Sequence, residues 1–302
     1  MADSAPLNEE EPPTLELRDV AIHRAGAVLL SSLDLSSRAR MLGLVGDWQA
    51  LAQVLTGKAQ VTGVARVLGH ELRPALGEGI LGFAPCDPPL AGRLSVREYL
   101  NLAAHLGHGS SARALVESER ALQEYGLAQL GPRKLRQLAP FERRALGIAA
   151  AAVNRPAVVF LEAPLRGLDA QTADYVAGLC TRAAKHSRVI VSAAFPSTPS
   201  PERALLDGCQ ELCVLAQGAV VAQGAPNQIF SPGARYLLGV SGANLAAFAT
   251  SLQDAGCRLT ERDAPGRYSV ELPENGTSDL LLDAALAANL VVLELQPVFA
   301  ND

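Results

Sequence analysis

The segment of residues 156–169 constrains the fold of this chain more than any other part of its sequence. Its first half, residues 157–161, is an uninterrupted apolar run, which is typical of a parallel strand buried on both faces. Glu162 ends this run, and ligands of open α/β sheets bind beyond the carboxyl ends of the strands. The turn-forming residues that follow are Pro164, Gly167 and Asp169. The segment therefore predicts an α/β fold with a parallel sheet.

Residues 161–169 resemble the Walker B strand and D-loop of ATP-binding cassette (ABC) ATPases, where Leu-Asp-Glu-Pro-x-x-Gly-Leu-Asp is usual. The frame is kept, but Ala163 stands where the family places its catalytic glutamate. The resemblance implies that Glu162 lies near the usual magnesium position. Without phosphates to share the ion, magnesium would bind weakly, and a surface acid at a strand end is the alternative. Asp169 is a partner-contact candidate, which ordinary turn chemistry explains equally well.

The family's phosphate-binding loop, Gly-x-x-x-x-Gly-Lys-Ser/Thr, is replaced after the strand predicted at residues 41–46. Backbone N–H groups of that loop cradle the phosphates, and its lysine reaches the β- and γ-oxygens. Here Gly46 is followed by Asp47, Trp48 and a helical pattern, so about four residues of the loop are missing, with the lysine. Asp47 is predicted to be the N-cap, which places a carboxylate where an ATPase binds phosphate. We interpret the segment as an ordinary capped helix.

Other positions of the family's nucleotide site also lack the residues that ATP chemistry needs. Cys86 stands in place of the Q-loop glutamine, and Ala194 in place of the histidine that positions the γ-phosphate. No histidine near Cys86 in sequence would activate its thiol, so we favour a plain substitution. In place of Ser-Gly-Gly-Gln, the family's signature position holds Ala139, Pro140, Phe141 and Glu142. The signature has lost a hydroxyl and a backbone donor and has gained a negative charge, although proline and glutamate suit a helix start.

Residues 88–100 preserve the resemblance best. Within them, residues 94–100 resemble the Leu-Thr-Val-x-Glu-x-Leu segment of ABC-2-type exporter ATPases, which begins the helical subdomain and lies where the membrane subunit docks. The resemblance implies a retained docking surface, whose candidate residues are Arg93, Leu94, Ser95, Val96, Glu98 and Tyr99. A capping box between Ser95 and Glu98 would explain those two residues without any partner.

The order of predicted elements indicates two domains after an acidic, Pro-rich tail. We expect residues 1–13 to be disordered. Residues 14–232 are predicted to form an α/β, ABC-ATPase-like domain (P-loop NTPase fold) with a helical subdomain at about 88–150. Residues 235–302 show a β-α-β-β-α-β order, which predicts a ferredoxin-like α+β domain. ABC-2-type ATPases often end in such an accessory domain, but small-molecule regulatory domains share this plan, and fold alone does not choose between them.

Composition and charge exclude several functional classes. A balance of 26 Lys+Arg against 31 Asp+Glu gives a net charge of −5, which does not suggest a nucleic-acid binder. No apolar run approaches the ~18 residues of a membrane span, and the acidic N-terminus is not a signal peptide. Five scattered cysteines fit a reducing cytosol. Cys209 and Cys213 lack further metal-ligand partners, so we expect buried apolar thiols and no metal site.

These observations favour a catalytically inactive subunit, a pseudo-ATPase without catalytic residues or cofactor and with weak or absent ATP and magnesium binding. It would dock on an ABC-2-type membrane permease at the inner face of the cell membrane. It would pair with an active ABC ATPase subunit, or with itself as a dimer. The alternative is a soluble regulatory protein that binds a small molecule in its C-terminal domain or in a vacated cleft lined by His23, Trp48 and Cys86. A third reading is a functional ATP-binding exporter subunit with an unusual loop.

Overall fold

The computed structural model describes residues 11–46, 48–56, 58–88, 92–108, 110–196, 200–216, 218–230, 235–262, 264–273, 276 and 278–297. The chain forms two compact units, Met1–Pro226 and Asn227–Asp302. Their division falls shortly before residue 232, where the sequence predicts the first domain to end. No helix in the described ranges is long and apolar enough to cross a membrane.

The prediction of a disordered tail over residues 1–13 is wrong for its last three residues. Residues 1–10 lie outside the described residues, but the next three contact the first unit. Arg188 forms an ion pair with Glu11, and the Leu68 amide donates a hydrogen bond of 3.0 Å to the Pro13 carbonyl. Residues 11–13 are therefore ordered, because these contacts hold the segment against neighbouring strands.

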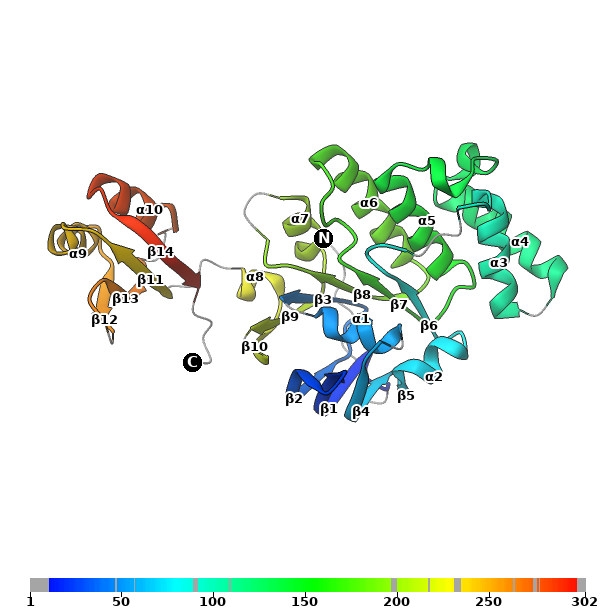
Figure 1. Ribbon diagram of the computed structural model, residues 1–302, viewed down its shortest axis with the longest axis horizontal. Coiled ribbons are helices and arrows are strands. Elements are labelled where there is room, and N and C mark those ends of the chain that lie inside the picture. The colour runs from blue at the N-terminus through cyan, green and yellow to red at the C-terminus, as the bar shows by residue number, and fades with distance from the viewer. Residues whose placement is uncertain are drawn as a thin grey trace. The chain divides into compact units, whose positions relative to one another are not determined.

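The first unit is built on a six-stranded sheet with the order β10-β9-β3-β8-β7-β6 (Figure 1). Its strands are β3 (Met41–Gly46), β6 (Leu81–Ala84), β7 (Val158–Glu162), β8 (Arg188–Ala193), β9 (Glu211–Ala216) and β10 (Ala219–Gly224). Neighbours pair in parallel except for β9 and β10. Strand β7 confirms the prediction from the apolar run, since residues 158–161 are at most 4% exposed.

A second, antiparallel sheet covers one face of the central sheet. Its order is β2-β1-β4-β5, with β1 (Leu15–Arg24), β2 (Ala27–Ser37), β4 (Gln60–Val67) and β5 (His70–Glu71). One hydrophobic cluster joins this sheet to the central strands and to the short helices α1 (Gln49–Leu55) and α2 (Leu72–Gly77). Leu17 of β1, Leu44 of β3, Trp48 and Phe160 of β7 all belong to it, so residues distant in sequence share one core.

Helices cover the other face of the central sheet, above the strands in Figure 1. They are α5 (Pro140–Ala152), α6 (Ala170–Ala183) and α7 (Pro201–Asp207). A helical hairpin of α3 (Val96–His108) and α4 (Ser111–Glu124) packs beside α5, within the range predicted for the helical subdomain. Two short 3₁₀ turns, Ala128–Leu130 and Leu135–Gln137, connect the hairpin to α5.

The second unit begins with the short helix α8 (Pro226–Ile229), most of which lies in this unit, followed by a β-α-β-β-α-β arrangement. Its elements are β11 (Arg235–Ser241), α9 (Leu245–Asp254), β12 (Arg258–Glu261), β13 (Arg267–Glu271), α10 (Ser278–Ala287) and β14 (Val291–Pro297). All neighbours in the sheet, ordered β12-β13-β11-β14, are antiparallel. Phe248, Leu252, Val270 and Leu281 form the centre of its core, so the unit has the ferredoxin-like plan.

Candidate functional site

The connection between β3 and α1 is very short. Strand β3 ends at Gly46 and α1 begins at Gln49, so only residues 47 and 48 lie between them. Gly46 has a φ of +101°, and a Cβ there would come within 2.0 Å of the Leu215 carbonyl oxygen, so the turn requires glycine. A phosphate cradle needs several successive backbone N–H groups that face the ligand. Two residues do not provide such a loop.

Trp48 fills this turn. Its side chain is 1% exposed, its indole Nε1 donates a hydrogen bond of 2.9 Å to the Val45 carbonyl, and its backbone amide donates one of 3.1 Å to the Gly46 carbonyl. Trp48 occupies the N-cap position, and among the described residues no side chain caps α1. The structure therefore places Trp48 in the N-cap position that the sequence assigns to Asp47. Asp47 itself lies outside the described residues.

Glu162, at the end of β7, contacts the segment that follows β6. Its Oε2 accepts a hydrogen bond of 3.1 Å from the backbone amide of Cys86. Burial raises the pKa of the Cys86 thiol, although the nearby Arg144 and Arg166 oppose this shift. The thiol is therefore protonated and a poor nucleophile, which agrees with a plain substitution at this position. Glu162 thus serves as an acceptor that joins two neighbouring segments.

Ala163 lies in a strained turn held from two sides. Its φ is +39°, its amide donates a hydrogen bond of 3.1 Å to Ser192 Oγ, and its carbonyl accepts one of 2.8 Å from Arg144 Nη1. Arg144 also donates to the Pro164 and Arg166 carbonyls at 3.3 Å, with its side chain only 11% exposed. The sequence analysis did not single out Arg144. The sequence feature that could have indicated its buried role is its position directly before the apolar run that starts at Ala145.

The segment that resembles the signature forms the first turn of α5. Glu142 Oε2 accepts a hydrogen bond of 2.7 Å from the Ala139 amide, and Glu142 Oε1 lies 2.7 Å from Arg133 Nη1. Pro140 is the first helical residue, and the Phe141 ring meets the Tyr175 ring edge-on, with centroids 5.9 Å apart. The carboxylate and the ring therefore make contacts within the chain. This agrees with the prediction that proline and glutamate begin a helix here. Ala194 follows the end of β8 and is exposed.

The predicted docking segment divides into buried and exposed residues. The Ser95 amide donates to Glu98 Oε2 at 2.6 Å, and the Glu98 amide donates to Ser95 Oγ at 3.2 Å, so the capping box forms. Ser95 and Val96 are buried, which leaves Arg93 and Glu98 as the fully exposed candidates. Leu94 and Tyr99 are partly exposed.

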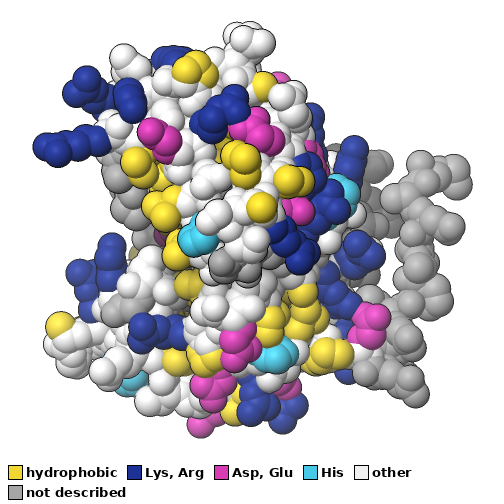
Figure 2. All heavy atoms as spheres, turned by 90° about the vertical axis from the view of Figure 1, so that its right-hand side faces the viewer, with side chains coloured by type: hydrophobic (Ala, Val, Ile, Leu, Met, Phe, Trp, Pro, Cys, Tyr) yellow, Lys and Arg dark blue, Asp and Glu magenta, His cyan; other side chains and the backbone are white. Residues whose placement is uncertain are grey.

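The helical hairpin beyond the docking segment carries apolar side chains at its surface. Leu102 and Leu106 of α3 are 49% and 82% exposed, and Leu115 and Val116 of α4 are 53% and 66% exposed. Figure 2 shows this side of the molecule, where apolar patches are interspersed with lysine, arginine and acidic side chains. The mixed character is that of an ordinary protein surface.

Asp169 has a local structural role. It is the N-cap of α6, where its Oδ1 accepts a hydrogen bond of 3.1 Å from the Thr172 amide and its Oδ2 accepts one of 2.8 Å from the Thr172 hydroxyl. These bonds hold the pKa of its carboxyl below the usual range. The residue is exposed, so a partner could still reach it, but turn chemistry already explains its identity.

Comparisons with known proteins find ATP-binding proteins of transporters. No protein-family model matches the chain. The chain is 25% identical over 252 residues to the broad substrate specificity ATP-binding cassette transporter ABCG2 of Bos taurus, which covers 76% of this chain but only 38% of that protein. It is 28% identical over 236 residues to the hemin import ATP-binding protein HmuV of Bordetella avium, covering 72% of this chain and 89% of the relative.

Solved structures show the same fold. A structure of an ATP-binding subunit of an ABC transporter superposes with a TM-score of 0.59 and 20% identity, over 72% of this chain and 91% of that one. The structure of cbiO1 from Clostridium perfringens, part of the ABC transporter complex cbiONQ, superposes with a TM-score of 0.61 and 19% identity. The match covers 73% of this chain and 92% of that one. The predicted ABC-ATPase (P-loop NTPase) fold is thereby confirmed. The relatives' names point to ATP-binding proteins of ABC transporters and include a hemin importer, so the ABC-2 exporter assignment stays a prediction.

Proposed function

We propose that this chain is a catalytically inactive, nucleotide-binding-domain-like subunit of an ABC transporter. In this proposal it docks on an ABC-2-type membrane permease at the inner face of the cell membrane. It pairs there with an active ATPase subunit, or with a second copy of itself, as a structural or regulatory component of transport. ATP and magnesium binding are weak or absent.

The observation that carries this proposal is the two-residue connection between β3 and α1, filled by Trp48. Phosphates bind ABC-type and other P-loop ATPases through a glycine-rich loop and its lysine. Here the chain turns directly into α1, and the indole is buried in the core. A triphosphate would have to displace a tryptophan whose burial stabilises the fold.

Other positions of the site support the same conclusion. Ala163 offers no carboxylate, and the Glu142 carboxylate is bonded to the Ala139 amide and Arg133. Loss of a single preorganised donor typically costs ~100-fold or more in rate, and several groups are missing together here. Because the named relatives are ATP-binding proteins, the absence of activity requires a direct test.

Trp48 supplies that test, since it is the only tryptophan of the chain and lies where the phosphate loop would be. We expect Mg-ATP to leave its fluorescence unchanged, and a fluorescent ATP analogue to show no energy transfer from it. ATP hydrolysis should equal that of a mock preparation. Turnover above the mock that disappears in Glu162→Gln would overturn the proposal and favour a functional ATP-binding subunit.

The docking part of the proposal needs a separate experiment. A tagged chain is recovered from gently solubilised membranes, and the bound proteins are identified by mass. Recovery of a polytopic membrane protein with an intact ATPase supports the proposal. Arg93→Glu with Tyr99→Ala should reduce that recovery, whereas Arg113→Glu, on an exposed position of α4, is the matched control and should not.

A second candidate function is a soluble regulatory protein that binds a small molecule. A cavity of about 250 Å³ at the ends of β7 and β8 favours it. Two results together would support this function over the first. The tagged chain would be recovered from membranes without partners, and a small ligand would change its Tm.

A further inference from the structure

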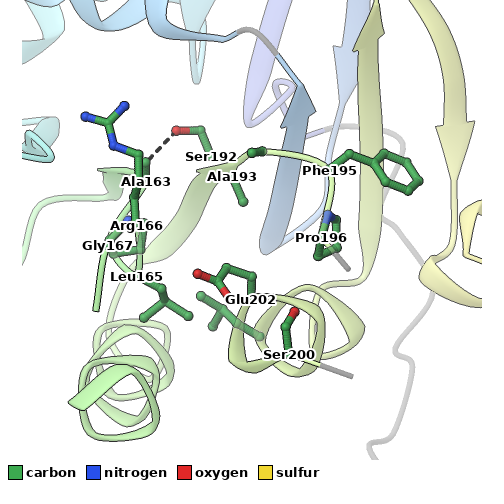
Figure 3. A pocket seen from close by; sticks show the side chains of 13 residues that line it. Ala163, Leu165, Arg166, Gly167, Ser192, Ala193, Phe195, Pro196, Ser200 and Glu202 are labelled. Carbon is green, nitrogen blue, oxygen red and sulfur yellow. Dashed lines mark hydrogen bonds between the residues drawn. The ribbon is translucent and has the colours of Figure 1, made fainter. Parts of the chain in front are cut away.

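The cavity lies between two loops at the carboxyl ends of β7 and β8. The turn of residues 163–167 forms one wall, and residues 192–196 with the start of α7 form the other (Figure 3). Its volume of about 250 Å³ is below the range of sites for drug-sized ligands. Most of the wall is apolar and includes Pro164, Leu165, Pro196 and Leu205. None of the described residues of the β3–α1 turn lines it.

One acidic side chain points into this cavity. Figure 3 shows the Glu202 carboxylate between Leu165 and the strand end at Ala193. No hydrogen bond or ion pair joins it to another described residue. The residue lies in the first turn of α7, where the backbone N–H groups favour a negative charge. The cavity is therefore lined by a carboxylate that pairs with no described residue.

The nearby arginines do not neutralise this charge. Arg166 lines the cavity, but its guanidinium points away from the Glu202 carboxylate, beyond Ala163 in Figure 3. Arg144 is engaged with the carbonyls of the 163–166 turn and lies 3.6 Å from Asp87. The charge of Glu202 would therefore repel an anionic ligand inside the cavity.

We propose that this cavity binds a small organic cation, an alkyl ammonium or quaternary ammonium compound, whose charge pairs with Glu202 and whose carbon atoms contact the apolar wall. A charge pair is stronger where apolar walls exclude water than at an open surface. Calcium and magnesium fit the cavity poorly, because these ions take about six or more oxygen ligands and Glu202 is the single carboxylate among the described lining residues. The proposal rests on the second candidate function, for which it names the ligand class, and does not depend on ATP or on a permease.

The test uses the purified full chain with choline and with its neutral isostere 3,3-dimethylbutan-1-ol, at matched ionic strength. Choline should raise Tm and give a measurable Kd by titration calorimetry. The isostere should bind at least about tenfold more weakly, because it lacks the positive charge that pairs with Glu202. Magnesium should have no effect. Butylammonium is the second probe, for a site that admits primary amines only.

Variants separate the carboxylate from the rest of the cavity. Glu202→Gln should weaken cation binding about tenfold or more, and Glu202→Asp should retain part of it. Asp174→Asn, at an exposed position of α6 outside the cavity, should bind as the wild type does. The proposal is overturned if neither cation binds, if the isostere binds equally well, or if folded Glu202→Gln keeps full affinity. None of these outcomes depends on the ATP and docking experiments.

Discussion

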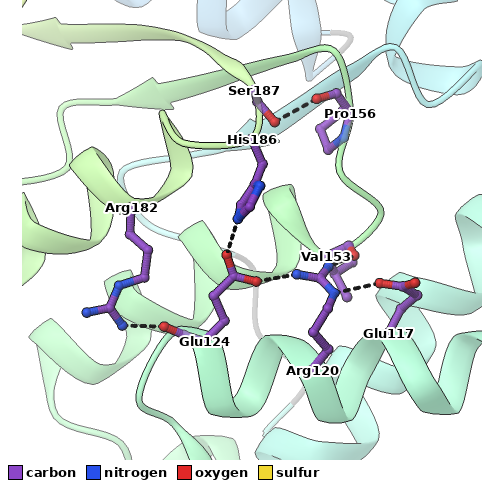
Figure 4. Close-up of polar contacts among 8 residues, drawn as sticks. All are labelled: Glu117, Arg120, Glu124, Val153, Pro156, Arg182, His186 and Ser187. Atoms are coloured by element: carbon purple, nitrogen blue, oxygen red, sulfur yellow. Dashed lines mark hydrogen bonds and ion pairs between the residues drawn. The ribbon is translucent and has the colours of Figure 1, made fainter.

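His186 and Glu124 connect the helical hairpin to the body of the first unit. His186 Nε2 lies 3.0 Å from Glu124 Oε1 (Figure 4), which joins the last turn of α4 to the segment between α6 and β8. Arg120 pairs with the other oxygen of Glu124, and Arg182 of α6 donates to the Glu124 backbone carbonyl. The Glu124 side chain is 17% exposed. Glu124 therefore joins α4 to α6 through its backbone carbonyl and to the segment after α6 through its carboxylate.

Glu124→Gln should destabilise the first unit by about 1–3 kcal/mol, because it leaves Arg120 and His186 without their shared anion. Urea unfolding followed by circular dichroism measures this change. Glu119→Gln is the control: Glu119 pairs with Arg97 but is 36% exposed, and surface pairs contribute only about 0.2–1 kcal/mol. Equal effects of the two variants would show that the Glu124 cluster is no more than surface charge.

Arg144→Met should destabilise the chain by about 1.5–3 kcal/mol, because three carbonyls of the 163–166 turn lose a charged donor. Methionine keeps much of the side-chain volume, so packing changes little. The matched control is Arg143→Met on the exposed side of the same helix. If both variants unfold at the same urea concentration, Arg144 does not hold the turn.

The sequence predicted the parts of the fold that local pattern controls. The apolar run before Glu162, the capping box of Ser95 and Glu98, and the turn residues up to Asp169 each depend on neighbouring residues only. These patterns suffice to indicate a parallel strand, a helix start and a turn. The resemblance of residues 14–232 to the motifs of ABC ATPases, in the same order, then implied the ABC-ATPase fold.

What the sequence could not predict depends on contacts between distant segments. Trp48 stands at the helix start because the indole is buried in a core shared with Phe160. The roles of Arg144 and His186 depend on how α5 and α4 lie against loops from other parts of the chain. Glu202 was not recognised because its cavity forms only when the ends of β7 and β8 meet. The spacing of residues along one helix or strand contains no information on contacts between distant segments.

Stability should decline in acid partly through two capping carboxylates. Hydrogen bonds from the Ser95 amide, then its hydroxyl, hold the pKa of Glu98 below its ordinary 4.5, and bonds from Thr172 hold that of Asp169 below 3.8. A lowered folded pKa stabilises the protein above the ordinary value, and this contribution is lost as pH falls through the folded pKa. The double variant Glu98→Gln with Asp169→Asn should therefore lose less Tm below about pH 5 than the wild type.

The five cysteines should react slowly while the chain is folded. All five are buried, as the sequence predicts for Cys209 and Cys213, and burial raises the pKa of Cys180, Cys209 and Cys213 to about 12. The reactive thiolate is scarce at neutral pH under these conditions. Ellman's reagent should detect five thiols in denaturant and release colour much more slowly from the native chain. A fast thiol that Cys86→Ala removes would contradict the buried, protonated state of Cys86.

Trp48→Ala should be among the most destabilising single substitutions, at about 3–5 kcal/mol, because it leaves a large cavity in the core. Trp48→Phe should cost less, since it keeps an aromatic ring and loses mainly the indole donor to Val45. Urea unfolding measures both. The Phe variant, if folded, also addresses the proposed function, because a smaller side chain opens the β3–α1 turn. It should still fail to bind ATP, since the loop and its lysine remain absent; ATP binding by this variant alone would show that the indole, and not the missing loop, is what excludes nucleotide.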